Sequence, residues 1–110
     1  MNQKEIALQF VQRFCAADIK GLEALLTTDL KFSGPLFQFE SRANYISSLN
    51  NNPPMPCQHH IISITENNHE VVIIYDYIKP DLTLTIAQLF TFDQQQKVRQ
   101  IRLIFDSKGL

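Results

Sequence analysis

The sequence predicts an α+β fold in which three N-terminal helices pack on a mostly antiparallel sheet. Two observations carry this prediction. In the first part of the chain, apolar residues recur every three or four positions, which is typical of amphipathic helices. The second half consists of four strand-like segments separated only by residues 67–68, 80–81 and 93–96. Connections this short favour an antiparallel meander, so the helices are expected to cover one face of it.

Composition indicates a single globular domain over residues 1–110, since 45% of the side chains are hydrophobic. The ten lysines and arginines are scattered and the formal net charge is −1, so no nucleic-acid partner is expected. Charged and amide side chains interrupt the N-terminus, and the longest apolar run, 71–75, is far too short to span a bilayer. We therefore expect a cytoplasmic protein with no membrane partner.

The first helix is predicted over residues 3–17, where a wide apolar stripe includes Ile6, Phe10 and Phe14. Asp18 is suited to accept hydrogen bonds from the free amides of a second, short helix. Leu22, Leu25 and Leu26 give that helix its apolar side, and residues 27–29 are expected to end it. Two helices should thus meet almost without a linker.

A strand, a break and a third helix follow. Residues 30–33 alternate between apolar and polar side chains, as a strand does, and the Gly34-Pro35 pair interrupts this pattern. Residues 36–39 are expected to resume the strand. Ser41 is a good N-cap for a helix that carries Tyr45. Residues 50–54 contain too many breakers to continue that helix, so a long loop is expected there.

The remaining strands are predicted over 57–66, 69–79, 82–92 and 98–106. Residues 71–75 are apolar on both strand faces, and in an antiparallel sheet this pattern means that both faces are covered. Helices can cover one face. We therefore expect a homodimer in which a second subunit covers the open sheet face.

Four stretches resemble the NTF2-like superfamily and, within it, the SnoaL-like group of small bacterial proteins: AADIKGLEALLTTDLKFSGP, FESRANYISSL, VVIIYDY and KVRQIRLIFD. The resemblance covers nearly the whole chain. It implies a cone-shaped, cystatin-like fold whose strongly bent sheet leaves an apolar cavity open at one end. Members of the superfamily include ketosteroid isomerases, polyketide cyclases and epoxide hydrolases, as well as transport, scaffold and assembly modules without chemistry.

Two further segments, VQRFCAA and FTFDQQQKV, resemble ketosteroid-isomerase segments that flank functional positions. On this register the oxyanion tyrosine of the isomerases corresponds to Phe14, their general-base aspartate falls at or beside Gly34, and their protonated aspartate corresponds to Gln88. Phenylalanine and glycine neither donate nor remove a proton. The resemblance therefore implies that steroid-isomerase chemistry is lost, while Gln88 can still donate a hydrogen bond.

Asp76 is an ionisable group in the most apolar strand, so it must be paired, protonated or exposed to a wet cavity. A strand aspartate bonded to a neighbouring hydroxyl or amide and a cavity-facing acid or base both remain open. A two-residue turn at 80–81 places Asp76 opposite Thr85, and a three-residue turn places it opposite Ile86. We favour the longer turn, which brings Asp76 and Gln88 into one cavity patch with Ile74 and Ile86.

Other candidates have competing interpretations. His59 and His60 point to opposite strand faces, so no metal site is expected. His60 is interpreted as a satisfied buried histidine on the face of Ile62 and Ile64, with a titrating cavity group as the alternative. Asp106 either pairs with Arg102 or faces the cavity.

The tyrosines and cysteines are assigned by strand face and sequence context. Tyr45 is expected at the cavity mouth. Tyr75 and Tyr77 lie on the other face of the strand from Asp76 and are expected at the dimer interface. Cys15 and Cys57 are interpreted as small buried hydrophobes rather than reactive thiols.

The predicted function is binding of a small, largely apolar molecule by a homodimer, with no cofactor and no metal. The glycines lie far apart and form no phosphate-binding loop. One alternative is an isomerase, cyclase or hydrolase that uses Asp76 as acid or base on a polyketide- or terpenoid-like substrate, and another is a non-catalytic association module. The expected ligand-binding residues are Phe10, Phe14, Phe32, Tyr45, His60, Asp76, Gln88 and Asp106.

Overall fold

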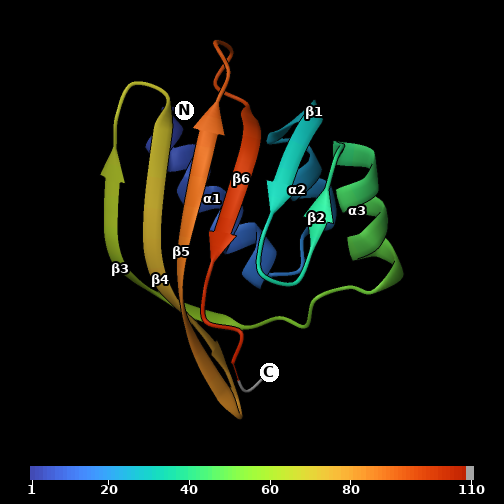
Figure 1. The fold of residues 1–110 in the computed structure, drawn as a ribbon, viewed down its shortest axis with the longest axis vertical. Coiled ribbons are helices and arrows are strands. Elements are labelled where there is room, and N and C mark those ends of the chain that lie inside the picture. Colours follow the sequence, from blue (N-terminus) through green and yellow to red (C-terminus); the bar gives the residue numbers. More distant parts are fainter. Residues whose placement is uncertain (109–110) are drawn as a thin grey trace.

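The structure is a computed structural model that describes residues 1–108. Figure 1 shows its helices and strands. In chain order they are α1 (Gln3–Cys15), α2 (Ile19–Glu23), β1 (Leu26–Ser33), β2 (Gln38–Phe39), α3 (Arg42–Asn51), β3 (Gln58–Glu66), β4 (Glu70–Lys79), β5 (Leu82–Phe92) and β6 (Val98–Ile104).

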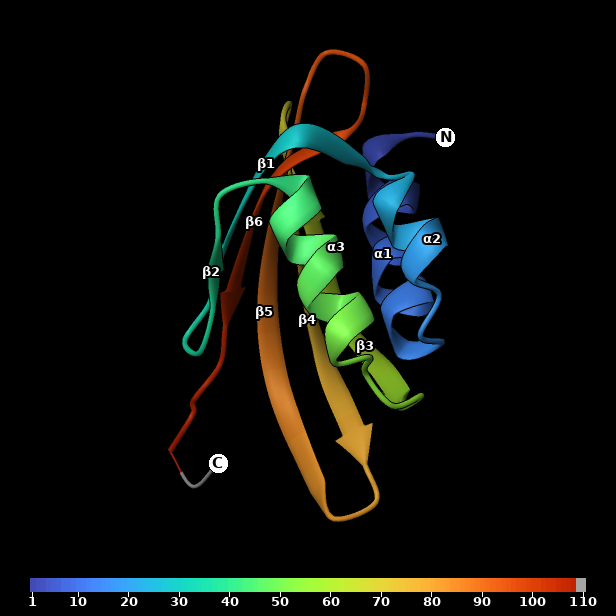
Figure 2. The ribbon, with the colours of Figure 1, turned by 90° about the vertical axis from the view of Figure 1, so that its right-hand side faces the viewer.

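The strands form a six-stranded sheet in the order β2-β1-β6-β5-β4-β3. The last four strands form the antiparallel meander that the short connections predict, while β1 pairs with β6 in parallel. All three helices lie on one side of this sheet, and the long strands β4 and β5 curve along it (Figure 2). The described residues therefore have the predicted α+β arrangement with a mostly antiparallel sheet.

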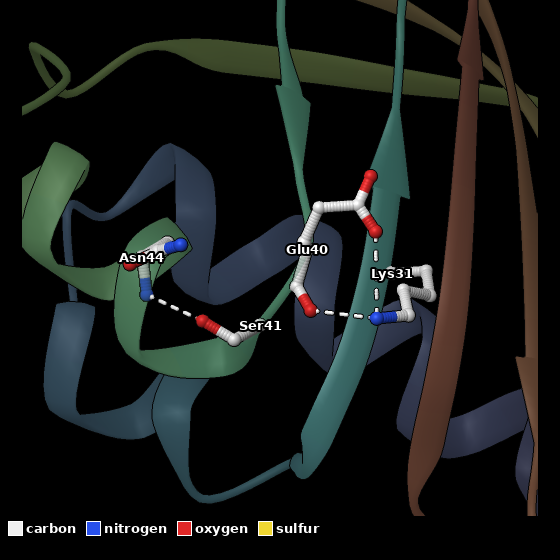
Figure 3. Close-up of polar contacts among 4 residues, drawn as sticks. All are labelled: Lys31, Glu40, Ser41 and Asn44. Carbon is white, nitrogen blue, oxygen red and sulfur yellow. Dashed lines mark hydrogen bonds and ion pairs between the residues drawn. The ribbon is translucent and has the colours of Figure 1, made fainter.

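Side-chain caps begin the second and third helices, as predicted. The Asp18 carboxylate accepts a hydrogen bond from the Gly21 amide at 3.0 Å, ahead of α2. The Ser41 hydroxyl accepts one from the Asn44 amide at 3.1 Å, ahead of α3 (Figure 3). Each cap satisfies a backbone donor that the first helical turn would otherwise leave free.

Two predicted boundaries in the first half are wrong. Strand β1 begins at Leu26, so residues 27–29 belong to the strand and do not end a helix. Parallel pairing with β6 holds both ends of this strand, at the Leu26–Val98 pair and again from Lys31 to Ser33, and it outweighs the leucine pattern. Strand β2 comprises only two residues, because Leu36 and Phe37 lie in a turn. The Gly34 amide closes this turn by donating a hydrogen bond of 2.9 Å to the Phe37 carbonyl.

The hydrophobic core lies between the helices and the sheet. Phe10 of α1 packs edge-to-face on Phe90 of β5, with ring centroids 5.3 Å apart. The largest fully buried side chains of the core are Phe10, Phe90, Leu22, Leu26, Leu30, Ile73 and Ile101. Burial of such side chains is the main favourable term that holds the helices to the sheet.

The turn between β4 and β5 contains two residues, because Lys79 pairs with Leu82. Asp76 consequently pairs with Thr85, and the predicted three-residue turn is wrong. A slip of one residue moves every side chain of a strand to the other face. Ile74 and Asp76 therefore lie on the open face of the sheet, whereas Ile86 and Gln88 face the helices.

In the part of the chain that the structure describes, no helix covers the other face of the sheet (Figure 2). Its apolar side chains are half-buried or exposed, and Ile104 of β6 is 60% exposed. The half-buried ones are Val72, Ile74, Ile78, Ala87 and Leu89. We call these five residues and Ile104 the open-face patch. Within residues 1–108, no helix is both long enough and apolar enough to cross a membrane.

Candidate functional site

A pocket of about 470 Å³ lies between the helices and the sheet. Its lining comes from α1, β1, β2, α3, β4, β5 and β6, and from the segments after β1, α3 and β6. Most of the lining residues are apolar, and the largest group among them is aromatic. The aromatic lining residues are Phe10, Phe14, Phe32, Phe37, Phe39, Tyr45, Tyr75, Tyr77 and Phe105.

One wall of the pocket is a packed aromatic cluster. Phe32 of β1 stacks on Tyr45 of α3, with ring centroids 4.9 Å apart and planes 17° apart. Phe39 of β2 lies against both rings, at 5.7 Å from Phe32 and 5.5 Å from Tyr45. Contacts in this distance range are favourable between aromatic rings, so the cluster holds β1, β2 and α3 together.

The rim of the pocket is apolar and open to solvent. Phe37, in the turn after β1, is 61% exposed, and Met55, in the loop after α3, is 78% exposed. Leu36 and Pro54 lie in the same two segments and also line the pocket. Exposed apolar side chains gathered around a hollow are typical of a binding site.

The floor of the pocket contains one buried polar pair. Gln88 of β5 is only 3% exposed, and its Oε1 accepts a hydrogen bond of 2.7 Å from the Tyr75 hydroxyl. Within residues 1–108 no hydrogen bond occupies the Nε2 hydrogens of Gln88. Tyr75 uses its only proton on Oε1, so the free donors of the pair are those of the Gln88 amide.

The pocket floor and walls carry no charge near neutral pH. Burial raises the pKa of Tyr45, Tyr75 and Tyr77, so these three phenols stay protonated. Lys79 is the one charged side chain among the described lining residues; it is exposed, and its Nζ lies 5.8 Å from the centre of the Tyr77 ring. None of the described lining residues is an aspartate, glutamate or histidine.

The three positions that the isomerase resemblance singles out all line this pocket. They are Phe14, Gly34 and Gln88. A Cβ atom at Gly34 would lie 3.3 Å from the Cβ of Leu103, so a side chain there would press on β6. None of the three can transfer a proton at neutral pH, and the geometry therefore provides hydrogen bonding rather than acid–base chemistry.

Five of the eight residues expected at the site line the pocket and three do not. Phe10, Phe14, Phe32, Tyr45 and Gln88 lie in its lining. His60, Asp76 and Asp106 lie elsewhere. Tyr75 and Tyr77, which the sequence assigns to a dimer interface, line the pocket instead, because the two-residue turn places them on the same face as Gln88.

Asp76 lies on the open face, where it accepts a hydrogen bond of 2.7 Å from the Thr85 hydroxyl. Of the two interpretations left open by the sequence, this is the strand aspartate bonded to a neighbouring hydroxyl. His60 pairs with Asp76 across the strands and is exposed. The expected buried histidine is wrong, because β3 shifts register between Ile61 and Ser63, and this bulge separates His60 from the face of Ile64.

Asp106 follows β6 and is exposed. Its carboxylate accepts a hydrogen bond of 2.9 Å from the Lys108 amide, so it caps a turn and neither pairs with Arg102 nor faces the pocket. In the described part of the chain, no group of three or more histidine, cysteine, aspartate or glutamate side chains could hold a metal ion.

Sequence reasoning missed the tyrosine donor and the rim. Side chains alternate between the two faces of β4, and a two-residue turn at Pro80-Asp81 places Tyr75 on the pocket face. This alternation was the sequence signal for Tyr75. The rim carried no such signal, since an exposed Phe37 or Met55 in a loop has no periodic pattern around it.

No protein-family model matches the chain, and no curated protein matches it. The chain does match solved structures. An NTF2-like protein of unknown function from Cytophaga hutchinsonii superposes with a TM-score of 0.81 at 17% identity, over 96% of this chain and 91% of that one. An LEH-like epoxide hydrolase from M. tuberculosis superposes with a TM-score of 0.76 at 16% identity, over 94% and 82%.

A de novo designed protein with a curved β-sheet matches equally well, with a TM-score of 0.79 at 12% identity over 96% of this chain and 86% of that one. At such identities the likeness concerns the fold alone, and the fold is that of NTF2-like proteins. Natural and designed chains share this architecture, so any function must be argued from the pocket.

Proposed function

We propose that this chain is a SnoaL-like member of the NTF2-like superfamily and that its pocket binds a small, largely apolar molecule. The observation that carries this proposal is an aromatic pocket of about 470 Å³ with a single buried polar pair, Tyr75 and Gln88, on its floor. Small-molecule sites in proteins typically enclose about 300–1,000 Å³ and combine apolar walls with a few polar groups.

The polar pair also defines what the ligand must offer. Gln88 presents its free Nε2 hydrogens while its Oε1 is held by Tyr75. A ligand carbonyl, ether or hydroxyl oxygen at the floor accepts that hydrogen bond, and an apolar body fills the aromatic walls. A ligand without an acceptor would leave the amide desolvated and unpaired, which is costly.

Binding explains the lining better than catalysis does. An isomerase, cyclase or hydrolase needs a group that moves a proton near neutral pH, and the described lining residues include no carboxylate and no imidazole. Asp76, the candidate acid or base, lies on the opposite face of the sheet. The epoxide hydrolase from M. tuberculosis therefore supports the architecture here and not a hydrolytic reaction.

A thermal-shift screen against steroids, terpenoids, fatty acids and aromatic acids tests the proposal. A ligand at a hundred times its dissociation constant stabilises the folded protein by about 2.7 kcal/mol. This corresponds to a rise of several degrees in the melting temperature of a domain of this size. No shift from any of the four classes would contradict the proposal.

Two matched variants locate the binding site for any compound that shifts the melting temperature. Gln88→Leu removes the donor from the floor, so the dissociation constant should rise roughly tenfold or more. Asp76→Asn changes a residue on the other face of the same sheet, and Asn can still accept from Thr85. Equal weakening by both variants would show that the compound does not bind in this pocket.

We also propose that the protein is a homodimer that pairs through the open-face patch. The supporting observation is that Ile74, Leu89 and Ile104 stay half-buried or exposed on the sheet face without helices.

Sedimentation of the wild type should give a dimer, and Ile74→Lys should give a folded monomer. Leu36→Lys, at an exposed position on the pocket rim, is the matched control and should leave the dimer intact. A monomeric wild type would exclude this arrangement.

A further inference from the structure

The two cysteines of the chain, far apart in the sequence, meet in the fold. Cys15 is the last residue of α1, and Cys57 directly precedes β3. The Cys57 amide donates a hydrogen bond of 2.9 Å to the Cys15 carbonyl. Residues joined in this way have Cα atoms about 5–6 Å apart, which is the separation that a disulfide spans.

The two thiols also lie near each other. Cys15 is 5% exposed and Cys57 is half-buried. Burial, followed by a hydrogen bond to the Cys57 thiol and repulsion from its charged form, raises the pKa of Cys15 to about 12. Cys57 also contributes to the raised pKa of the Tyr77 phenol, so it lies near the pocket wall that Phe14 and Tyr77 form.

We propose that Cys15 and Cys57 are a redox modification site that forms a reversible intramolecular disulfide. The bond would tie the end of α1 to the loop that carries Pro53, Pro54 and Met55, three residues of the pocket rim. This inference rests on the backbone hydrogen bond that brings the two cysteines together, and it is independent of any ligand.

The oxidant is a low-molecular-weight disulfide such as oxidised glutathione. Cys57, the more accessible sulfur, attacks as the thiolate and forms a mixed disulfide, and one small thiolate leaves and takes up a proton. Cys15 then loses its proton to solvent and attacks the Cys57 sulfur, releasing the second small thiol. Two protein thiols and one small disulfide thus give one protein disulfide and two small thiols, so both electrons pass to the small molecule.

The burial of Cys15 determines that Cys57 reacts first. A thiol with a pKa near 12 is almost fully protonated at neutral pH, so Cys15 is a poor first nucleophile. Once Cys57 carries the mixed disulfide, the attack is intramolecular between two residues that a backbone hydrogen bond already holds together, which raises the effective concentration of Cys15.

The test is to incubate the reduced, folded protein with mixtures of oxidised and reduced glutathione, quench with acid and measure intact mass and free thiols. The two thiols of the chain should disappear together, and a peptide map without reductant should link Cys15 to Cys57. The linked form should melt several degrees higher than the reduced form, because the bond constrains the unfolded chain. Reductant should restore both thiols.

Single-cysteine variants separate this outcome from unspecific oxidation. Cys15→Ser should stop at the mixed disulfide on Cys57, and its melting temperature should not rise on oxidation. Wild-type protein that accumulates glutathione on Cys57 while Cys15 stays free would overturn the proposal. So would a disulfide between two chains, or a bond that forms only in denaturant.

Discussion

The hydrogen bond between Tyr75 and Gln88 is the polar contact on which the proposed site depends. Both side chains are buried, so each needs a partner to offset the loss of water. Tyr75→Phe leaves the Gln88 Oε1 buried without a donor, and this should lower the free energy of unfolding by about 1–2 kcal/mol. Urea unfolding followed by circular dichroism measures the change.

A double-mutant cycle tests whether this loss comes from the pair. Replacing Gln88 by Leu as well removes the stranded acceptor, so the double variant should be more stable than the sum of the two single changes predicts. The coupling energy should be about 1 kcal/mol. Additive effects within about 0.3 kcal/mol would mean that the hydrogen bond contributes little to stability.

At the scale of elements, α3 positions one pocket wall through its N-cap. Ser41→Ala removes the acceptor for the Asn44 amide and should lower the free energy of unfolding by about 1 kcal/mol. Ser47 lies exposed within the same helix and offers a matched control. Ser47→Ala should be neutral or slightly stabilising, since alanine is the better helix former. Equal losses in both variants would exclude capping as the cause.

The ion pair that joins β1 to the segment after β2 should contribute much less. The Lys31 ammonium lies 3.4 Å from the Glu40 carboxylate, with both side chains mostly exposed, and it also donates to the Glu40 carbonyl at 2.8 Å (Figure 3). Glu40→Gln keeps the backbone contact and should change the free energy of unfolding by less than about 0.5 kcal/mol. A larger, salt-dependent loss in urea unfolding would show that the charge matters.

Elements with a strong local signal were predictable from the sequence. The caps at Asp18 and Ser41 and the four meander strands follow from side-chain chemistry and periodicity, and the strand bounds differ from prediction by no more than two residues. The start of β1 was not predictable, because its partner β6 lies some seventy residues further along the chain. Its local leucine pattern suits a helix equally well.

Which side chains face the pocket was less predictable than where the strands lie. Strand faces alternate with period two, so the turn length at Pro80-Asp81 decides the direction of Asp76, and the bulge in β3 decides that of His60. Neither feature has a sequence signal strong enough to fix it. Phe14 and Gln88 correspond by resemblance to functional positions of the isomerases, and both line the pocket, although the longer turn that was expected to place Gln88 there is wrong.

At the scale of the whole molecule, the two faces of the sheet differ. One face is exposed to solvent or to a partner, and the other forms, together with the helices, a pocket without charge on its floor. Three phenols around that pocket are buried enough for their pKa to be raised, and Cys15 behind it has a pKa near 12. The folded protein therefore holds these protons more tightly than the unfolded chain does. Linkage then makes stability depend on pH at the alkaline end.

We expect the free energy of unfolding to be independent of these groups below about pH 8.5 and to fall as pH rises above about 9–10. The ordinary values are 9.0 for the Cys15 thiol and 10.0 for the Tyr45 and Tyr75 phenols. Above them the unfolded chain has lost protons that the folded chain retains, so rising pH favours unfolding. Each buried phenol should add a slope of up to about 1.4 kcal/mol per pH unit.

Urea unfolding at intervals from pH 8 to pH 11 measures this dependence, and Tyr45→Phe provides the control. Phenylalanine cannot ionise, so the variant should lose part of the alkaline slope even if its stability at pH 8 is also lower. The comparison is therefore between slopes rather than between absolute stabilities. A wild type whose stability stays constant up to pH 11 would mean that these phenols ionise as readily in the folded protein as in the unfolded chain, and that the pocket is wetter than its lining indicates.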